Sequence, residues 1–355
     1  MNRRRLLGSV GVLGAVGKLA GAGRAAAQDT VAEPTGAWRI DTHHHAIAPE
    51  MQNWLVRNGI LPPDQDKWPT WARWSAEETL NIMDANGIAA GVMSAPAPFE
   101  IFGSPRQVAE AARICNASLA EVVKENPGRF GFFAYLPLTS VEDSIGEIEY
   151  SLDTLGADGV LLMTHVDGRY LGDPGYEPIF AELARRRAVC FIHPQFIPGG
   201  SPQGIPDFMG DFLLDTTRSA IRLMLSGTLD RYPDLPIILS HGGGFLPYMA
   251  GRIDSRTHSE EGVEPATLRR HVRRFYYDTA TPTSPYATPS LLAAADPARL
   301  LFGTDWNMRT AEEVRQVVDG HVRDPALDSR ARRRIGRDNA LRLLPSLSER
   351  VARVA

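Results

Sequence analysis

Residues 40–45 read Ile-Asp-Thr-His-His-His, an apolar start followed by three consecutive imidazoles. This pattern is typical of a buried strand, in which successive side chains face opposite sides. His43 and His45 would therefore point to one face and His44 to the other. Two imidazoles that share one face of a strand can bind a single divalent metal ion. The stretch therefore predicts a strand that ends in a metal site.

Seven further segments of the chain have the same short, apolar character. Each is apolar on both faces, as expected for a parallel strand covered by helices, and helical patterns alternate with them. Eight such units predict an α/β fold, a (β/α)8 TIM barrel with an extended loop after the first strand and extra C-terminal helices. The expected strands after residues 40–45 are Ile88–Ala95, Phe130–Leu136, Gly159–His165, Ala188–His193, Ile237–His241, Phe275–Thr279 and Leu300–Asp305.

The first 27 residues look like an export signal. Arg3, Arg4 and Arg5 precede a Gly- and Ala-rich stretch that ends in three alanines, an order similar to a twin-arginine signal. Residues 1–27 are therefore expected to direct export to the periplasm or beyond, and 28–355 to form a single metal-dependent barrel domain. The alternative is a disordered basic N-terminus, which would leave the protein in the cytoplasm. The stretch is only weakly apolar and contains Lys18, so no stable membrane anchoring is expected.

Composition excludes some partners. A net charge of −4 gives no sign of the basic face that a nucleic-acid partner would need. Cys115 and Cys190 are too few for a disulfide framework. With 43% apolar and 23% charged residues, the chain has the composition of an ordinary soluble globular protein.

Two more metal-binding side chains are expected at strand ends. His193 ends the fifth strand and Asp305 ends the eighth, and a barrel brings the carboxyl ends of its strands together. Each residue alone could equally be a polar side chain with a structural hydrogen bond. Together with His43 and His45 they form a set of three imidazoles and one carboxylate. That set suits one divalent ion, Zn2+ in the first place and Mn2+ as the alternative.

These motifs resemble the amidohydrolase superfamily. The resemblance rests on Asp-x-His-x-His at 41–45, His193, Ser-His-Gly-Gly-Gly at 240–244 and Gly-Thr-Asp at 303–305. It extends from about Ile40 to Leu344, and the run from His241 to Arg252 is similar to the branch of aminocarboxymuconate-semialdehyde and 6-methylsalicylate decarboxylases. Binuclear members of the superfamily carry a carbamylated lysine on the fourth strand. Here the lysines are Lys18, Lys67 and Lys124, so a single metal is expected.

The resemblance also implies roles for residues beyond the metal ligands. His241 would be catalytic beside the metal, whereas as a bare feature it could cap the glycine turn. Arg252 would bind a substrate carboxylate, reaching into a neighbouring subunit of a homodimer, although alone it would be a solvated helix residue. Arg73 is a second expected anion binder, and His165, at the end of the fourth strand, is an expected neighbour of the site.

The segment Ala46–Trp74 contains four of the six tryptophans: Trp54, Trp68, Trp71 and Trp74. It is expected on the face of the barrel where active sites are built. One interpretation is an aromatic lid over the substrate, with Trp74 as a contact residue. The other is a loop that uses its tryptophans to pack itself onto the barrel. The sequence leaves both open.

The expected reaction is non-oxidative decarboxylation of a small aromatic or unsaturated, salicylate-like carboxylic acid. Asp305 would donate the proton to the carbon that loses CO2, with His241 assisting. In the alternative route a metal-bound hydroxide, deprotonated by His241, would add to the substrate first, and the sequence leaves both routes open. The alternative is a hydrolase of lactones or amides that uses a metal-activated water with the same ligands. A non-catalytic metal- or ligand-binding protein is the third hypothesis. Carboxylate recognition by Arg252 would separate the first from the second.

Overall fold

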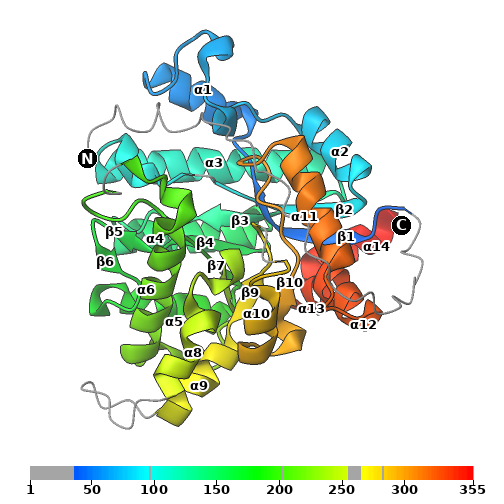
Figure 1. Cartoon of the computed structure of the whole chain (residues 1–355). Coiled ribbons are helices and arrows are strands. Elements are labelled where there is room, and N and C mark those ends of the chain that lie inside the picture. Colours follow the sequence, from blue (N-terminus) through cyan, green and yellow to red (C-terminus); the bar gives the residue numbers. More distant parts are fainter. Residues whose placement is uncertain (1–35, 96, 201–203, 255–264, 282–283, 355) are drawn as a thin grey trace.

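The computed structural model describes residues 36–354, apart from residues 96, 201–203, 255–264, 282 and 283. Eight parallel strands lie side by side in the order β1-β2-β3-β4-β7-β8-β9-β10, so each expected strand pairs with the next one along the chain (Figure 1). This confirms the predicted barrel. The strands are β1 Arg39–His45, β2 Ile88–Ser94, β3 Phe130–Tyr135, β4 Gly159–Met163, β7 Cys190–His193, β8 Ile237–Leu239, β9 Tyr276–Asp278 and β10 Leu300–Leu301.

The first and last strands approach each other to close the ring. The amide and the hydroxyl of Thr42 both donate to the carbonyl of Phe302, each at 2.9 Å. Farther along, the amide of Asp305 donates to the carbonyl of His43 at 2.8 Å. Asp41 strengthens the join, because its carboxylate accepts from the amide of Thr304 at 3.0 Å. The barrel is therefore closed by hydrogen bonds on the same residues that carry the expected metal site.

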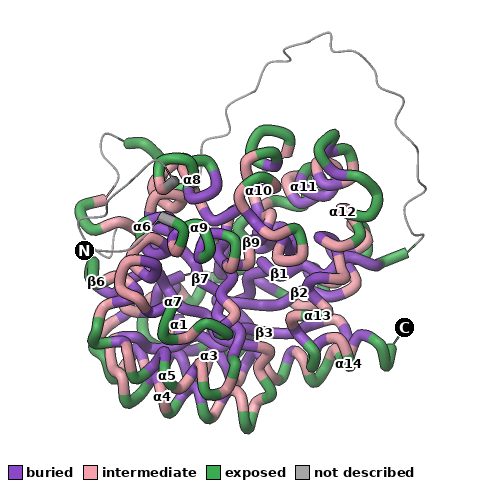
Figure 2. The backbone as a smooth tube through the Cα atoms, turned by 90° about the horizontal axis from the view of Figure 1, so that it is seen from below, coloured by how far each residue is buried: buried purple, intermediate pink, exposed green. Residues whose placement is uncertain are grey.

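Helices surround the strands and are exposed on their outer faces, while the strands are buried (Figure 2). Ser75 and Ser140 cap α2 and α4 as their sequences suggest, with side chains that accept from the third helical amide. The longer helices are α1 Pro49–Arg57, α2 Ala76–Ala85, α3 Pro105–Glu125, α4 Val141–Glu149, α5 Glu177–Arg186, α6 Asp211–Leu225, α8 Leu246–Asp254, α9 Pro265–Arg274, α10 Thr288–Ala294, α11 Ala311–Arg323 and α14 Pro345–Val354. Shorter pieces are α7 Thr228–Arg231, α12 Ser329–Arg333 and α13 Asn339–Leu343.

The structure corrects three expectations. Residues Pro49–Arg57, expected in a loop, form α1, since proline starts the helix and Met51, Trp54 and Leu55 bury one face of it. The fourth strand ends at Met163, because His165 belongs to a separate hairpin of β5 His165–Val166 and β6 Arg169–Tyr170. The last strand is only two residues long, and its continuation to Asp305 is irregular backbone.

The four tryptophans of the segment after β1 are all buried. Their exposed fractions are between 1% and 6%, and they belong to the main hydrophobic core. Trp54 donates its ring N–H to Glu110 on α3 at 3.0 Å, and the carbonyl of Trp71 accepts from Asn307 at 3.0 Å. Of the two interpretations of this segment, packing onto the barrel is the one that these contacts support.

The C-terminal helix is tied to the barrel by one buried charge. Arg350 on α14 donates to Asp158 at 2.6 Å, and the Asp158 side chain is fully buried at the start of β4. Replacing Arg350 with alanine leaves that carboxylate unpaired, so we expect the free energy of unfolding to fall by about 3 kcal/mol. Thermal unfolding would measure the change. Arg353→Ala is the control, since Arg353 and Glu349 form an exposed pair, and we expect little change there. Equal stability of both variants would contradict this prediction.

The predicted export signal, residues 1–27, lies outside the described residues and stays a prediction. In the described part of the chain, no helix is long and apolar enough to cross a lipid bilayer.

Candidate metal centre

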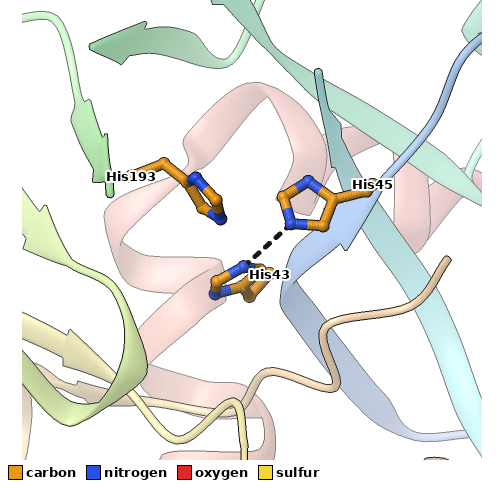
Figure 3. Close-up of side chains that lie close together, drawn as sticks. All are labelled: His43, His45 and His193. Atoms are coloured by element: carbon orange, nitrogen blue, oxygen red, sulfur yellow. Dashed lines mark hydrogen bonds between the residues drawn. The ribbon is translucent and has the colours of Figure 1, made fainter. Parts of the chain in front are cut away.

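The side chains of His43 and His45 meet at the carboxyl end of β1. Their Nε2 atoms are 3.1 Å apart (Figure 3). Both side chains are fully buried. His44 points the other way, as the alternation of a strand requires, and its Nδ1 lies 3.0 Å from Asp41. The prediction that His43 and His45 share one face is confirmed.

His193, the last residue of β7, completes the group. Its ring centroid lies 4.8 Å from that of His45 and 5.3 Å from that of His43, and the three rings face a common point (Figure 3). Its Nδ1 lies 2.9 Å from the carbonyl of Pro194. A carbonyl only accepts, so Nδ1 carries the proton, and Nε2 presents a lone pair to the group. The candidate ligand atoms of these three histidines all lie within 4.8 Å of one another.

Asp305 brings a carboxylate to the same point. Its Oδ1 lies 3.2 Å from His45 Nε2 and 3.4 Å from His43 Nε2. Its second oxygen, Oδ2, lies 3.8 Å from His241 Nε2. The four predicted ligands therefore converge, with one carboxylate oxygen directed at the imidazoles and the other at His241.

The arrangement of lone pairs fits a cation. His43 Nδ1 donates to the Asp278 carboxylate at 2.8 Å, so the Nε2 of His43 carries no proton in the neutral ring. That lone pair, the Nε2 lone pair of His193 and the carboxylate oxygen of Asp305 are all acceptors directed at one buried region. The ring of His45 can offer one proton among them, because its Nε2 lies 3.1 Å from His43 Nε2 and 3.2 Å from Asp305 Oδ1. One proton does not satisfy three acceptors, and a divalent ion would remove the repulsion that remains. The residues present therefore fit a mononuclear site of three imidazoles and one carboxylate.

The pKa values of these groups reflect burial and mutual charge. Burial lowers the pKa of His45, and burial together with the neighbouring histidines lowers that of His193 well below its usual range. Burial also opposes charge on His43, yet contact with Asp278 raises its pKa. Burial would raise the pKa of Asp305, but the neighbouring imidazoles of His241, His45 and His43 hold it well below its usual value. Asp305 is therefore a carboxylate, the form a metal ligand needs.

His241 follows β8 and begins a turn of three glycines. A Cβ on Gly243 would lie 2.5 Å from the Tyr277 ring, and one on Gly244 would lie 2.1 Å from the carbonyl of Leu213. Both positions also have positive φ, so only glycine fits there. The amide of His241 donates to Asp278 at 2.9 Å. The turn thus places the imidazole of His241 so that its ring centroid lies 4.8 Å from that of His43.

Three non-glycine residues around the site have left-handed backbone. They are His241 with φ 53°, Thr281 with φ 63° and Asp305 with φ 64°. Each follows a different barrel strand, β8, β9 or β10. Such conformations are costly and concentrate at functional sites, where the surrounding structure enforces them. Their convergence is a second sign, independent of residue chemistry, that function resides at this end of the barrel.

Asp278, which ends β9, was not among the predicted site residues. Its carboxylate accepts from His43 Nδ1 and from the amides of His241 and Ala280. It therefore fixes one expected ligand and one expected catalytic residue at once. Its place at the end of the seventh strand was the only signal in the sequence, and an isolated Asp there gives no indication of which histidine it orients.

Asp278→Asn is expected to weaken metal binding by about 10- to 100-fold, the usual effect of removing the partner of a ligand imidazole. The amide keeps the size of the side chain but cannot hold His43 in the same charge environment. Metal affinity would be measured by competition with a chelator. Asp296→Asn is the control, because Asp296 caps the turn before β10. The metal affinity of this variant should equal that of the wild type. Unchanged affinity in Asp278→Asn would contradict the prediction.

The other predicted residues have surroundings of their own. Arg252 lies exposed on α8, while the imidazoles are buried. Arg73 donates to the backbone carbonyls of Trp68 and Asp66 within its own loop. The ring of Trp74 lies 6.4 Å from that of Phe130, at the amino end of β3. Their roles in substrate binding stay predictions, and the described contacts favour packing roles for Arg73 and Trp74.

His165 belongs to a different polar group. Its Nδ1 accepts from the amide of Gly168 at 3.2 Å, and its Nε2 lies 3.6 Å from Asp215. Asp215 is buried on α6 and also accepts from Tyr170 and from the amide of Gln195. The β5–β6 hairpin is fastened to the barrel in this way. The predicted contact of His165 with the site is not seen among these interactions and stays a prediction.

Comparison with known proteins agrees with this geometry. The amidohydrolase family model matches residues 40–346. The chain is 35% identical over 322 residues to a 6-methylsalicylic acid decarboxylase of Penicillium expansum, covering 87% of this chain and 97% of the relative.

Two solved structures share the fold over most of their length. One is 2,6-dihydroxybenzoate decarboxylase in complex with 2,6-dihydroxybenzoate, with a TM-score of 0.73 and 26% identity over 87% of this chain and 99% of that one. The other is a dihydroxybenzoic acid decarboxylase of Polaromonas with bound manganese and 2-nitroresorcinol, with a TM-score of 0.74 and 25% identity over 87% and 97%. The match over nearly the whole barrel, together with the convergence of its motif residues, means that this chain belongs to the amidohydrolase family.

Proposed function

We propose that this protein is a metal-dependent, non-oxidative decarboxylase of a small aromatic acid of the salicylate type. The observation that carries the proposal is the convergence of His43, His45, His193 and Asp305 on one buried point beside His241. The similarity to a 6-methylsalicylic acid decarboxylase supports the choice of substrate class. The site's own chemistry supports the dependence on metal.

His43, His45, His193 and Asp305 would hold one divalent ion. When bound, that ion supplies Lewis acidity toward an oxygen of the substrate and a fixed point for its orientation. Three imidazoles and a carboxylate suit Zn2+, while the manganese in a related dihydroxybenzoic acid decarboxylase supports Mn2+ as the alternative. Elemental analysis and reconstitution with each metal would distinguish them.

His241 and Asp305 would deliver the proton that replaces the lost CO2. Loss of CO2 leaves the bonding electron pair on the ring carbon, which must receive one proton to give the product arene. We assign that proton to the pair of His241 and Asp305, whose Nε2 and Oδ2 lie 3.8 Å apart. The pKa of Asp305 is held well below its usual value, so Asp305 must take up a proton before it can deliver one, and we assign that transfer to His241. A positioned acid of this kind typically raises the rate by about 10²- to 10⁴-fold.

Arg252 is assigned to carboxylate recognition across a homodimer. The proposal rests on its exposure at the end of α8, directly after the glycine turn that carries His241. Mixing an Arg252→Ala variant with a His193→Ala variant tests it. If the arginine acts across the interface, one of the two sites in each mixed dimer is complete. The mixture should then recover about a quarter of the wild-type activity, or up to about a half if all dimers are mixed. No recovery would contradict a shared site.

The activity itself is tested with metal-loaded protein and a set of ortho-hydroxybenzoates. Release of CO2 and of the corresponding phenol is the expected result, with Arg252→Ala impaired. If lactones or amides are hydrolysed instead and no CO2 is released, the protein is a hydrolase with the same metal site. Binding of metal without either reaction would indicate a non-catalytic protein.

A further inference from the structure

Arg309 lies four residues after Asp305 in the segment that leads from β10 to α11. Its Nε lies 3.4 Å from Asp305 Oδ2, and its Nη2 donates to the hydroxyl of Thr281 at 3.1 Å. Both partners are among the residues with left-handed backbone. The side chain is 18% exposed, so the guanidinium is held at the border between the buried cluster and solvent.

One edge of this guanidinium is not committed to a short hydrogen bond. Nη1 lies 3.6 Å from Glu313 Oε1, which is beyond hydrogen-bond distance. Glu313 has another role, because its Oε2 accepts from the amide and hydroxyl of Thr310 and so completes the capping box of α11. Its side chain is also 43% exposed, and solvent screens its attraction for Arg309.

We propose that Arg309, within the same chain, binds the carboxylate of the acid that this site acts on, in addition to the Arg252 that a neighbouring subunit would contribute. The inference rests on the proposed function, which requires an anionic substrate beside Asp305. A guanidinium offers several N–H groups in one plane and pairs well with a carboxylate. The product of decarboxylation has lost that group. Arg309 therefore distinguishes the acid from its neutral product, and it favours binding of the one and release of the other.

The charges of the site agree with this assignment. Asp278 and Asp305 are the two buried carboxylates in contact with the imidazoles, and together they balance one divalent ion. Arg309 adds one positive charge, which the half-exposed carboxylate of Glu313 balances only weakly across 3.6 Å, and an incoming carboxylate can share it. A carboxylate bound by Arg309 would lie beside Asp305 at the edge of the cluster, since Arg309 Nε is 3.4 Å from Asp305 Oδ2.

The kinetic consequence is specific. The carboxylate loses negative charge as CO2 forms, so Arg309 binds the starting acid at least as strongly as the transition state. Removing Arg309 should therefore raise KM while leaving kcat within a few-fold of the wild type. A residue that only positions Asp305 would give the opposite pattern, a lower kcat together with weaker metal binding.

The test compares two ligands of nearly the same shape, salicylate and 2-nitrophenol, in which a neutral nitro group replaces the carboxylate. Binding to metal-loaded protein would be measured by calorimetry for the wild type, Arg309→Ala, Arg309→Lys and the control Arg315→Ala. Arg315 is exposed on α11 and pairs with Glu312, so its removal changes net charge equally. We expect Arg309→Ala to weaken salicylate binding by about 10- to 100-fold, with 2-nitrophenol nearly unchanged. Arg309→Lys should be intermediate and Arg315→Ala should match the wild type.

Three results would overturn the inference. Equal weakening of both ligands, unchanged affinity for salicylate, or loss of bound metal in Arg309→Ala would each give Arg309 a different role. The outcome for the proposed function is separate. If the wild type binds salicylate in an Arg309-dependent way but releases no CO2 from any hydroxybenzoate, the inference stands and the decarboxylase proposal fails.

Discussion

His193→Ala is expected to lose both the bound metal and turnover. His193 is 7% exposed, its Nδ1 is held by the carbonyl of Pro194, and its Nε2 is one of the ligand atoms that converge with those of His43 and His45. Alanine leaves a buried gap that water can fill but cannot match as a ligand. Since a metal contributes several kcal/mol to transition-state stabilisation, kcat/KM should fall on the order of 10³-fold or more. Metal content by elemental analysis and steady-state kinetics would measure the two losses.

His271→Ala is the matched control for this variant. His271 is also a buried histidine, but it lies on α9 and contacts Asp230. We expect it to keep its metal and most of its turnover. If His271→Ala lost the metal and His193→Ala kept it, the assignment of ligands would be wrong.

His241→Asn is expected to lower kcat by about 10²- to 10⁴-fold while the metal content stays that of the wild type. Asparagine is chosen because His241 has φ 53°, and asparagine tolerates this left-handed conformation better than alanine does. The glycine turn and the amide bond to Asp278 should therefore survive. The side chain of asparagine cannot shuttle a proton near neutral pH, so only proton transfer is removed.

Circular dichroism and metal analysis would show whether the His241→Asn fold and site are intact. Deuterium incorporation into the product, measured in heavy water, adds an independent readout of proton delivery. A variant that turns over at the wild-type rate would exclude His241 from catalysis. A variant that loses the metal would instead make His241 a ligand or a support of the ligands.

The features predicted well from sequence are those that follow from one strand at a time. The alternation of His43, His44 and His45 predicts which rings share a face, and their place at a strand end predicts convergence with His193 and Asp305. Parallel strands of a barrel bring their carboxyl ends together whatever the details of the loops. Four residues from three distant segments could therefore be assigned to one site.

The features missed depend on contacts between segments. Asp278 acts through its distance to His43 and to the amide of His241, and Arg309 through its position beside Asp305 and Thr281. The contacts of Asp278 and the contact of Arg309 with Thr281 join separate segments, and their distances do not follow from spacing along the chain. The contacts of Arg73 could not be predicted for the same reason. Its partners are backbone carbonyls, such as that of Trp68, which approach it only in the folded loop. Helix α1 was not predicted, because its buried face is short and consists of Met51, Trp54 and Leu55.

The closure of the barrel has a consequence for biosynthesis. Thr42 and Phe302, which join β1 to the end of β10, are 260 residues apart, and His43 and Asp305 lie beside that junction. A ribosome that adds about 5–20 residues per second needs on the order of tens of seconds to make the second half of the site after the first. During that interval the nascent chain carries an unpaired histidine cluster with low affinity for metal. The full affinity for metal requires Asp305, which follows the last strand. Tight metal binding is therefore expected only after that strand has been synthesised.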